Sequence, residues 1–253
     1  MRDFTLETYT DLIQALLDTG YSTLTVREYL TRRYRSAKHA VIRHDVDRRP
    51  MNARRMAELE HALGIASTYY FRYPATFDPG LITQIRDLGH EIGYHYEVLA
   101  KTNGDYRRAI ALFTDELRVF RAICDVQTIC MHGSPLSRYD NRDLWKEYDF
   151  RDYGIEGEAY LSMAGEGFRY LTDTGRSWSG KHTVRDTMPD ARTVTHPMET
   201  TANLIDQIKS SELGGLYLTV HPERWAGNST EWVIKSVSDF VVNAGKWLIC
   251  AMR

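Results

Sequence analysis

The sequence predicts an α/β fold of the barrel type, because short apolar runs alternate with helical stretches from residue 40 onward. The chain has 253 residues, and single-domain α/β barrels run to roughly 200 to 250 residues. Apolar residues make up 43% and charged residues 26%, the balance of a globular protein with a sizeable core. We therefore expect one domain over residues 1–253, with a helical cover at 1–38 and a barrel at 39–253.

The N-terminal segment predicts two helices that form this cover. Residues 7–17 carry four aliphatic side chains on one helical face. These are Leu12, Ile13, Leu16 and Leu17. The pattern stops at Gly20, and Thr25 begins a second short helix that runs through Leu30.

The rest of the chain predicts about seven strands in α/β order. The apolar runs lie at residues 40–46, 67–72, 90–96, 126–132, 168–173, 192–197, 215–221 and 247–252. The expected helices lie near residues 51–63, 79–88, 105–123, 199–211 and 230–243. The segment 136–190 is rich in Gly, Asp, Arg and aromatic residues, and only residues 168–173 in it have a clear strand pattern.

Charge and composition argue against several classes of partner. Lys and Arg number 32 against 34 Asp and Glu, so the net charge of −2 provides no basic field for nucleic acid or an anionic membrane. The N-terminus does not have the pattern of a signal peptide. No run of about 18 apolar residues predicts a membrane span. We expect a cytoplasmic protein. The three cysteines have no CxxC spacing, which indicates neither a disulfide framework nor a thiolate zinc site.

Histidines gather at the predicted strands. His44, His90, His95, His132, His196 and His221 lie in these strands or at their edges. In a parallel barrel the carboxyl ends of the strands meet at one face, where active sites are built. Histidines from different strands are therefore expected to converge.

Two carboxylates follow each other closely in the first strand. Asp45 and Asp47 in "RHDVD" are two positions apart, so a continuing strand directs both to one side. Two carboxylates on one side repel unless a cation lies between them or one keeps its proton. This pattern favours a metal ligand beside a general base. The alternative is that one aspartate caps the helix that begins near Pro50.

"GHEIGYHYE" repeats this spacing with His95 and Glu97, beyond a glycine that permits close backbone approach. Mixed oxygen and nitrogen ligands suit Zn²⁺ or another first-row divalent ion. For His90 a structural role is favoured. For His132 three roles remain open, namely metal ligand, substrate contact and turn residue. Trp178, after a strand and near a polar loop, either stacks on a sugar face or belongs to the core.

The segments "RHDVD", "GHEIGYH" and "YLTVH" resemble motifs of the polysaccharide deacetylase family, the NodB-homology or carbohydrate esterase family four enzymes. The resemblance covers roughly residues 40–225 and is strongest to a divergent "RHDVD" branch linked to bacterial surface polysaccharide synthesis. It implies a distorted (β/α)7 barrel. It also implies one divalent metal, most often zinc, that serves to hydrolyse the N-acetyl amide or O-acetyl ester of a sugar.

The resemblance also implies roles for individual residues. Asp45 matches the catalytic base and His221 the general acid, while Asp47 and His95 match metal ligands. The family's second histidine, four positions after His95, is Leu99 here, so either Glu97 or His132 is expected to supply the missing ligand. The family's Arg before Pro is absent from "HGSP". The expected substrate contacts are Arg43, Ser134, Asp173, Trp178 and Arg224.

These observations favour a metal-dependent hydrolase that removes an acyl group from an N-acyl sugar. The expected substrate is a nucleotide- or lipid-linked saccharide used in surface polysaccharide or O-antigen synthesis. One alternative is a non-catalytic carbohydrate-binding barrel with an eroded metal site. Another is a phosphoesterase, for which two-metal sites need bridging carboxylates. The sequence has too few strand-end ligands for two ions.

Overall fold

The structure is a computed structural model, which describes residues 2–32, 38–134, 137–181, 183, 185–188, 198–210 and 213–237. The expected strands at 192–197 and 247–252, together with His196, lie outside these ranges.

The described strands form one sheet in which every paired neighbour is parallel. The strands are β1 (Ser22–Leu24), β2 (His39–Val46), β3 (Thr68–Phe71), β4 (Glu91–Tyr96), β5 (Thr128–Met131), β6 (Gly157–Glu158), β7 (Arg169–Thr172) and β8 (Leu216–Val220). Their order is β6-β5-β4-β3-β2-β8-β7, and β1 pairs with the first part of β2. The chain therefore places β2 and β8, far apart in sequence, side by side.

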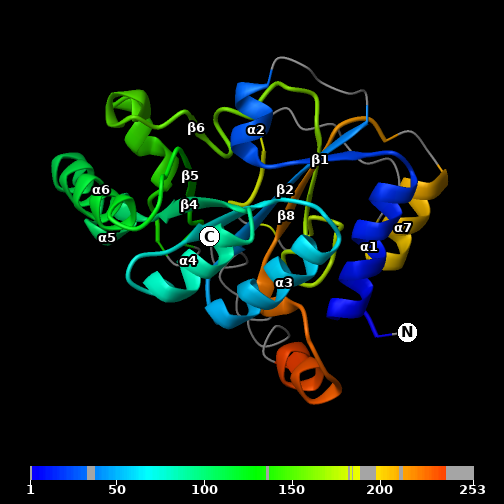
Figure 1. Ribbon diagram of the computed structural model, residues 1–253. Coiled ribbons are helices and arrows are strands. Elements are labelled where there is room, and N and C mark those ends of the chain that lie inside the picture. The colour runs from blue at the N-terminus through cyan, green and yellow to red at the C-terminus, as the bar shows by residue number, and fades with distance from the viewer. Residues whose placement is uncertain are drawn as a thin grey trace.

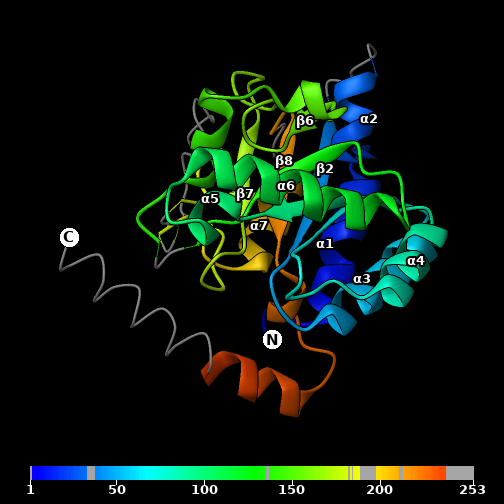
Figure 2. The same cartoon turned by 90° about the vertical axis from the view of Figure 1, so that its left-hand side faces the viewer.

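Helices flank this sheet on its outer side (Figures 1 and 2). They are α1 (Leu6–Asp18), α2 (Val26–Thr31), α3 (Pro50–Ala62), α4 (Pro79–Asp87), α5 (Val98–Lys101), α6 (Tyr106–Arg121) and α7 (Thr201–Ser210). Residues 229–237 are also helical. Short 3₁₀ helices occur at η1 (Asn141–Lys146), η2 (Phe150–Tyr153) and η3 (Pro222–Arg224).

The predicted fold class is confirmed, as a parallel sheet curled into a half-barrel with flanking helices. Six of the predicted apolar runs contain a strand of this sheet, namely β2, β3, β4, β5, β7 and β8. The sequence pattern did not indicate β1, β6 or the 3₁₀ helices. Because β1 pairs with β2, the segment 1–38 contributes to the sheet as well as covering it.

The glycine expected to permit close approach has this role in β4. A Cβ atom on Gly93 would lie 2.2 Å from Cε1 of Tyr70, and 3.0 Å from the backbone oxygen of Thr128. The Tyr70 ring therefore crosses β4 where a side chain is missing, and its hydroxyl donates to Thr128 Oγ1 at 2.9 Å. The inner face of the half-barrel is closed at this level by an aromatic ring.

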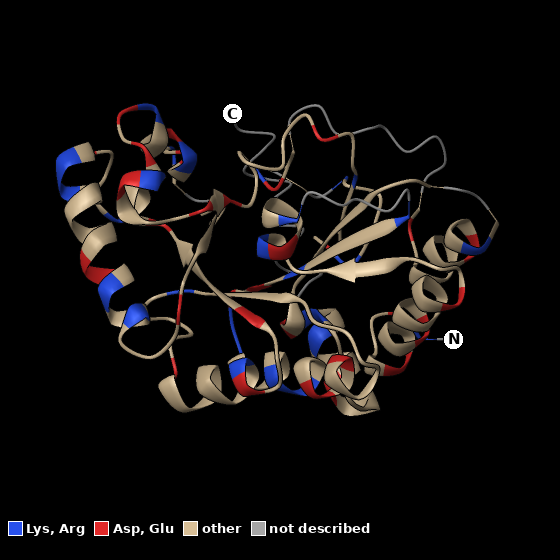
Figure 3. Ribbon diagram, turned by 45° about the horizontal axis from the view of Figure 1, so that its top comes forward, with Lys and Arg blue, Asp and Glu red and all other residues tan. Residues whose placement is uncertain are grey.

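Charged side chains of both signs are interspersed along the helices, as Figure 3 shows. This distribution agrees with the small net charge of −2. Within the described residues, no helix combines the length and apolar character needed to cross a bilayer.

The start of the chain is joined to the loop after β8. Leu6 N donates to Ala226 O at 2.9 Å, and Ala226 N donates to Phe4 O at 2.9 Å. The Phe4 ring lies 5.1 Å from the Trp225 ring, centroid to centroid. The N-terminal segment thus holds the chain immediately after His221.

Glu60 in α3 is the centre of a buried polar network on the outer face of the sheet. Its carboxylate accepts hydrogen bonds from His44 Nε2 at 2.8 Å, Ser67 Oγ at 2.6 Å and Tyr69 Oη at 2.7 Å. Burial opposes ionisation of Glu60, but His44 outweighs it and lowers the pKa of Glu60 to about 2. His90 also lies here, with Nε2 at 3.0 Å from Ala57 O. His44 and His90 therefore belong to the support of the sheet and do not converge with the other histidines.

We predict that Glu60→Gln lowers the free energy of unfolding by about 3 kcal/mol, because it removes one partner of a buried charged network. The folded pKa of Glu60 is depressed from 4.5 to about 2, so its contribution is present above pH 4.5 and declines as the pH falls toward 2. Urea unfolding across this pH range measures the difference from wild type.

The matched control is Glu58→Gln on the same helix, whose side chain is 49% exposed and pairs with Arg54. It should change stability by less than about 1 kcal/mol. Equal effects of the two substitutions would contradict the assignment.

Candidate active site

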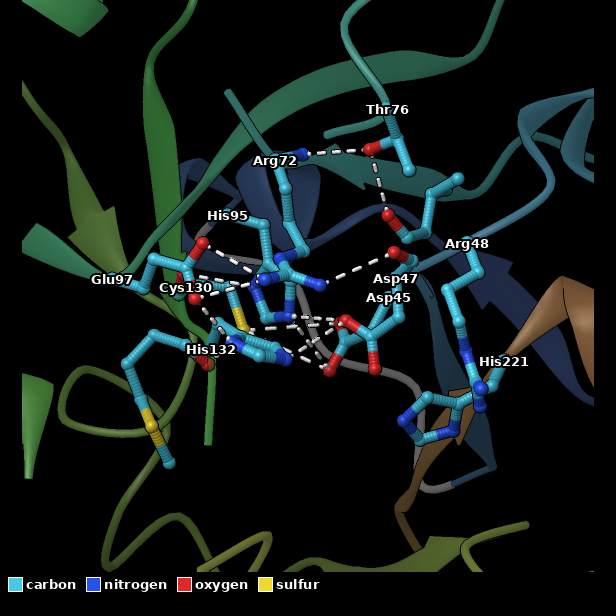
Figure 4. Close-up of polar contacts among 12 residues, drawn as sticks. Asp45, Asp47, Arg48, Arg72, Thr76, His95, Glu97, Cys130, His132 and His221 are labelled. Carbon is cyan, nitrogen blue, oxygen red and sulfur yellow. Dashed lines mark hydrogen bonds and ion pairs between the residues drawn. The ribbon is translucent and has the colours of Figure 1, made fainter. Parts of the chain in front are cut away.

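A cavity of about 250 Å³ opens at the carboxyl ends of β2, β4, β5 and β8. Seven of the predicted site residues line it. They are Asp45, Asp47, His95, His132, Ser134, His221 and Arg224. Parallel strands thus bring together the side chains that the sequence places at strand ends. In Figure 4, His95, Glu97 and His132 lie on one side of the two aspartates, and Arg48 and His221 lie on the other.

Asp47 lies between two of these histidines. Its Oδ1 is 3.4 Å from His95 Nε2 and 3.5 Å from His132 Nε2. This oxygen is buried and has no hydrogen-bond partner among the described residues. Burial would raise the pKa of Asp47, but His132 and His95 outweigh it and hold the pKa well below its usual range. The carboxylate is therefore charged and turned toward two ring nitrogens.

The far side of each imidazole ring is held by an acceptor. His95 Nδ1 lies 3.0 Å from Cys130 O, and His132 Nδ1 lies 2.8 Å from Glu97 Oε2. A proton on Nδ1 of each ring leaves both Nε2 lone pairs directed at Asp47. Such outer partners fix the tautomer and orientation of metal-ligating histidines. One oxygen and two nitrogens are a donor set that suits Zn²⁺ or another first-row divalent ion.

Glu97 occupies the outer position in this arrangement. The strand ends at Tyr96, and Glu97 receives both hydrogen bonds from Arg72 Nη2, at 2.8 and 2.9 Å. Its carboxylate also contacts the ring of His132 and accepts a hydrogen bond from Ser134 Oγ at 3.2 Å. The geometry thus favours His132 over Glu97 as the third ligand. Leu99, at the position of the family's second histidine, is buried in the hydrophobic core.

A second group of donor atoms shares His95. Carboxylate, imidazole and thiol atoms of Asp45, His95 and Cys130 lie within 4.8 Å of one another, a spacing that permits metal binding. Burial, however, raises the pKa of the Cys130 thiol well above its usual range, and only the thiolate is a strong ligand. Arg43 Nη1 also donates to this sulfur. The Asp47 group offers a charged carboxylate and two ring nitrogens instead, and the two groups share His95.

Asp45 and Arg43 form an ion pair under the cavity. Arg43 Nη2 lies 3.6 Å from Asp45 Oδ2, and the Arg43 side chain is completely buried. Arg43 does not line the cavity. The prediction that Arg43 contacts substrate is therefore wrong, and the residue instead supports Asp45 from within the half-barrel.

His221 is held by Asp173 from β7's end. Asp173 Oδ1 lies 2.6 Å from His221 Nδ1, and Asp173 Oδ2 accepts from His221 N at 3.0 Å and from Trp225 Nε1 at 2.8 Å. Burial would lower the pKa of His221, but Asp173 outweighs it and raises the pKa to about 9. Asp173 is fully buried behind His221. It positions this histidine, and the predicted contact of Asp173 with substrate is wrong.

Trp178 belongs to the core. It is 3% exposed, its Nε1 donates to Thr201 Oγ1 at 3.1 Å, and its ring stacks against Phe4. It therefore offers no face to a sugar, and the expectation of a stacking platform is corrected. Ser134 and Arg224 do line the cavity as expected of substrate contacts.

The sequence prediction did not include Asp186, which also lines the cavity. Its carboxylate accepts from Thr172 Oγ1 at 2.7 Å and Thr174 Oγ1 at 2.8 Å, and also from the hydroxyls of Tyr160 and Tyr170. Burial opposes its charge, but His221 and Arg43 hold its pKa well below the usual range. Asp186 follows no strand pattern, and no sequence signal marks it.

Comparison with known proteins gives likenesses to solved structures. No family model and no curated protein matches the chain. The fold is similar to that of a Streptococcus mutans CE4 esterase, with 12% identity over 87% of this chain and 85% of that chain, and a TM-score of 0.46. It is also similar to a family 4 carbohydrate esterase from Bacillus anthracis, with 13% identity over 94% and 86% and a TM-score of 0.39.

We predict that Asp173→Asn lowers the pKa of His221 from about 9, because burial still opposes the charge while the carboxylate is gone. In the wild type, folding raises the pKa of His221 from 6.5 to about 9, so the protonated ring stabilises the folded state. This stabilisation is complete below pH 6.5 and is lost as the pH rises through 9. An NMR titration of the His221 ring measures both states. A pKa still near 9 in the variant would contradict this account.

We also predict that His132→Ala weakens zinc binding more than Glu97→Gln does. The first removes a ligand, whereas the second removes an outer partner, which costs about 10- to 100-fold in affinity. Competition with a chromophoric chelator measures the affinities, and His61→Ala, an exposed histidine on α3, serves as the control. If Glu97→Gln abolished binding and His132→Ala preserved it, Glu97 would be the ligand.

Proposed function

We propose that this protein is a metal-dependent hydrolase that removes an acyl group from an N-acyl sugar. The observation that carries the proposal is the Asp47, His95 and His132 donor set, flanked in one cavity by a second buried carboxylate and a buried histidine. These two flanking groups are Asp45 and His221. A base and an acid on either side of a cation site are the parts that amide hydrolysis requires.

The residues present fit a divalent cation. The buried Oδ1 of Asp47 has no hydrogen-bond partner in the described part of the chain. The two histidine rings that face it each have an acceptor beside Nδ1, so that Nε2 can bind a cation when the proton is on Nδ1. A cation bound there would lower the pKa of its bound water and would polarise the acyl carbonyl. We propose zinc, because it accepts this mixed oxygen and nitrogen set.

The chain's own residues supply the proton transfers. Asp45 takes a proton from the attacking water, and Arg43 at 3.6 Å gives this carboxylate a cationic partner. His221, charged below about pH 9, donates a proton to the amide nitrogen as the C–N bond breaks. The products are a free carboxylic acid and an amino sugar. Asp173 keeps the His221 ring in orientation throughout.

The alternative of an eroded, non-catalytic barrel rested on Leu99 standing in place of a second histidine. His132, on the neighbouring strand end, faces the same carboxylate that such a histidine would join. A two-metal phosphoesterase is less well supported, because the two possible donor groups share His95. The hydrolase therefore has the stronger support.

The motif resemblance supports a finer proposal. We propose that the substrate is a nucleotide- or lipid-linked saccharide in bacterial surface polysaccharide or O-antigen synthesis, and that the reaction takes place in the cytoplasm. Incubation of zinc-loaded protein with a panel of N-acyl sugars, followed by mass spectrometry, identifies which substrate loses its acyl group.

We predict that Asp45→Asn lowers the rate of acyl release by about 10²- to 10⁴-fold, the usual contribution of a general base. Zinc stoichiometry should stay that of the wild type, because Asp45 is not in the favoured ligand set. The control is Asp87→Asn, an exposed aspartate whose side chain is 61% accessible. Wild-type turnover by Asp45→Asn, with zinc bound, would overturn the role of Asp45.

A further inference from the structure

The cavity wall has an excess of positive charge. Four arginines line it, namely Arg48, Arg72, Arg185 and Arg224, against the three carboxylates of Asp45, Asp47 and Asp186. His221 adds a further positive charge below about pH 9. A divalent cation would increase this excess, and a cleft lined mainly by one sign of charge focuses its field on an incoming ion of the other sign.

Three of the arginines have short or buried partners within the protein. Arg72 gives two hydrogen bonds to Glu97, at 2.8 and 2.9 Å. Arg185 donates to the backbone oxygens of Gly133 and Tyr139. Arg224 Nε lies 3.6 Å from the buried carboxylate of Asp173.

Arg48 is in a different situation. Its side chain is 53% exposed, and its Nε lies 3.8 Å from Glu223 Oε1, which is too long for a hydrogen bond. It follows Asp47 directly, so its backbone is anchored at the cation site while its guanidinium reaches solvent in the cavity. A guanidinium with this freedom presents its fork of donors to an incoming oxyanion.

The position of Arg48 relates it to one half of the substrate. In Figure 4 the Arg48 side chain lies on the same side of the aspartates as His221 and opposite to His132 and Glu97, and both Arg48 and His221 line the cavity. In the proposed reaction His221 protonates the amide nitrogen, which stays with the sugar. Groups on the His221 side of the cavity therefore face the sugar, and the acyl group lies toward the other side.

We propose that the sugar carries an anionic group, a phosphate or a carboxylate, and that Arg48 binds it and determines specificity for it. This inference rests on the proposed function, because the orientation of the sugar follows from the role of His221. In this inference Arg48 binds the substrate and takes no part in proton transfer.

The test is calorimetric titration of zinc-loaded protein with glucose, glucose 1-phosphate and glucuronate, none of which carries an acyl group to be hydrolysed. We expect at least one anionic sugar to bind about tenfold more tightly than glucose. Arg48→Ala should remove about tenfold of that affinity and Arg48→Lys should restore part of it. Arg54→Ala, an arginine on α3 that pairs with Glu58, is the matched control and should leave affinity unchanged.

The two anionic ligands distinguish a phosphate source from a carboxylate source. If zinc alone bound the phosphate, Arg48→Ala would bind glucose 1-phosphate as tightly as the wild type does. This outcome would overturn the inference. Equal binding of all three sugars would also overturn it. In turnover, Arg48→Ala should raise KM for the anionic N-acyl sugar and leave kcat near the wild-type value.

Failure of the inference and failure of the proposed function give different results. Arg48-dependent binding of an anionic sugar, without release of any acyl group, would refute the hydrolase and leave the anion site standing. Asp45-dependent hydrolysis that is equally efficient for neutral and anionic sugars would refute the anion site and leave the hydrolase standing.

Discussion

The buried guanidinium of Arg43 is the constraint on which the floor of the site depends. It lies inside the half-barrel, where its Nε donates to Thr219 at 2.8 Å and its plane covers the Tyr160 ring at 4.2 Å. Its Nη2 lies 3.6 Å from Asp45 and 3.7 Å from Asp186. A buried charge without partners costs several kcal/mol. The Arg43 guanidinium therefore needs the carboxylates of Asp45 and Asp186 as partners, and they need it. Its hydrogen bond to Thr219 also joins β2 to β8 beneath the cavity.

Above this floor, each histidine that lines the cavity has a partner behind it. Asp173 stands behind His221, Glu97 behind His132, and the Cys130 carbonyl behind His95. The partners come from strand ends or from the residues next to them, so the rigidity of the parallel sheet passes directly to the site. The side chains that line the cavity and their supports thus derive from the same register of strands.

The sequence predicted what depends on local pattern and missed what depends on tertiary contact. Strand ends and alternation were enough to bring Asp45, Asp47, His95 and His221 to one place. They left the choice between Glu97 and His132 open. Side chains two residues apart point to the same side of a strand only as long as the strand continues, and β4 ends at Tyr96, before Glu97. Trp178 and Asp186 lie in the segment 136–190 beyond its one clear strand pattern, which ends at Asp173. Their partners, such as Thr201 and Arg43, are remote in sequence.

The backbone pairing of Phe4 and Leu6 with Ala226 links the first residues of the chain to the turn that follows His221. An addition or deletion close to Phe4 acts on this turn although it is more than two hundred positions away in sequence. A purification tag or a shortened N-terminus can therefore alter the result of any measurement of the His221 pKa.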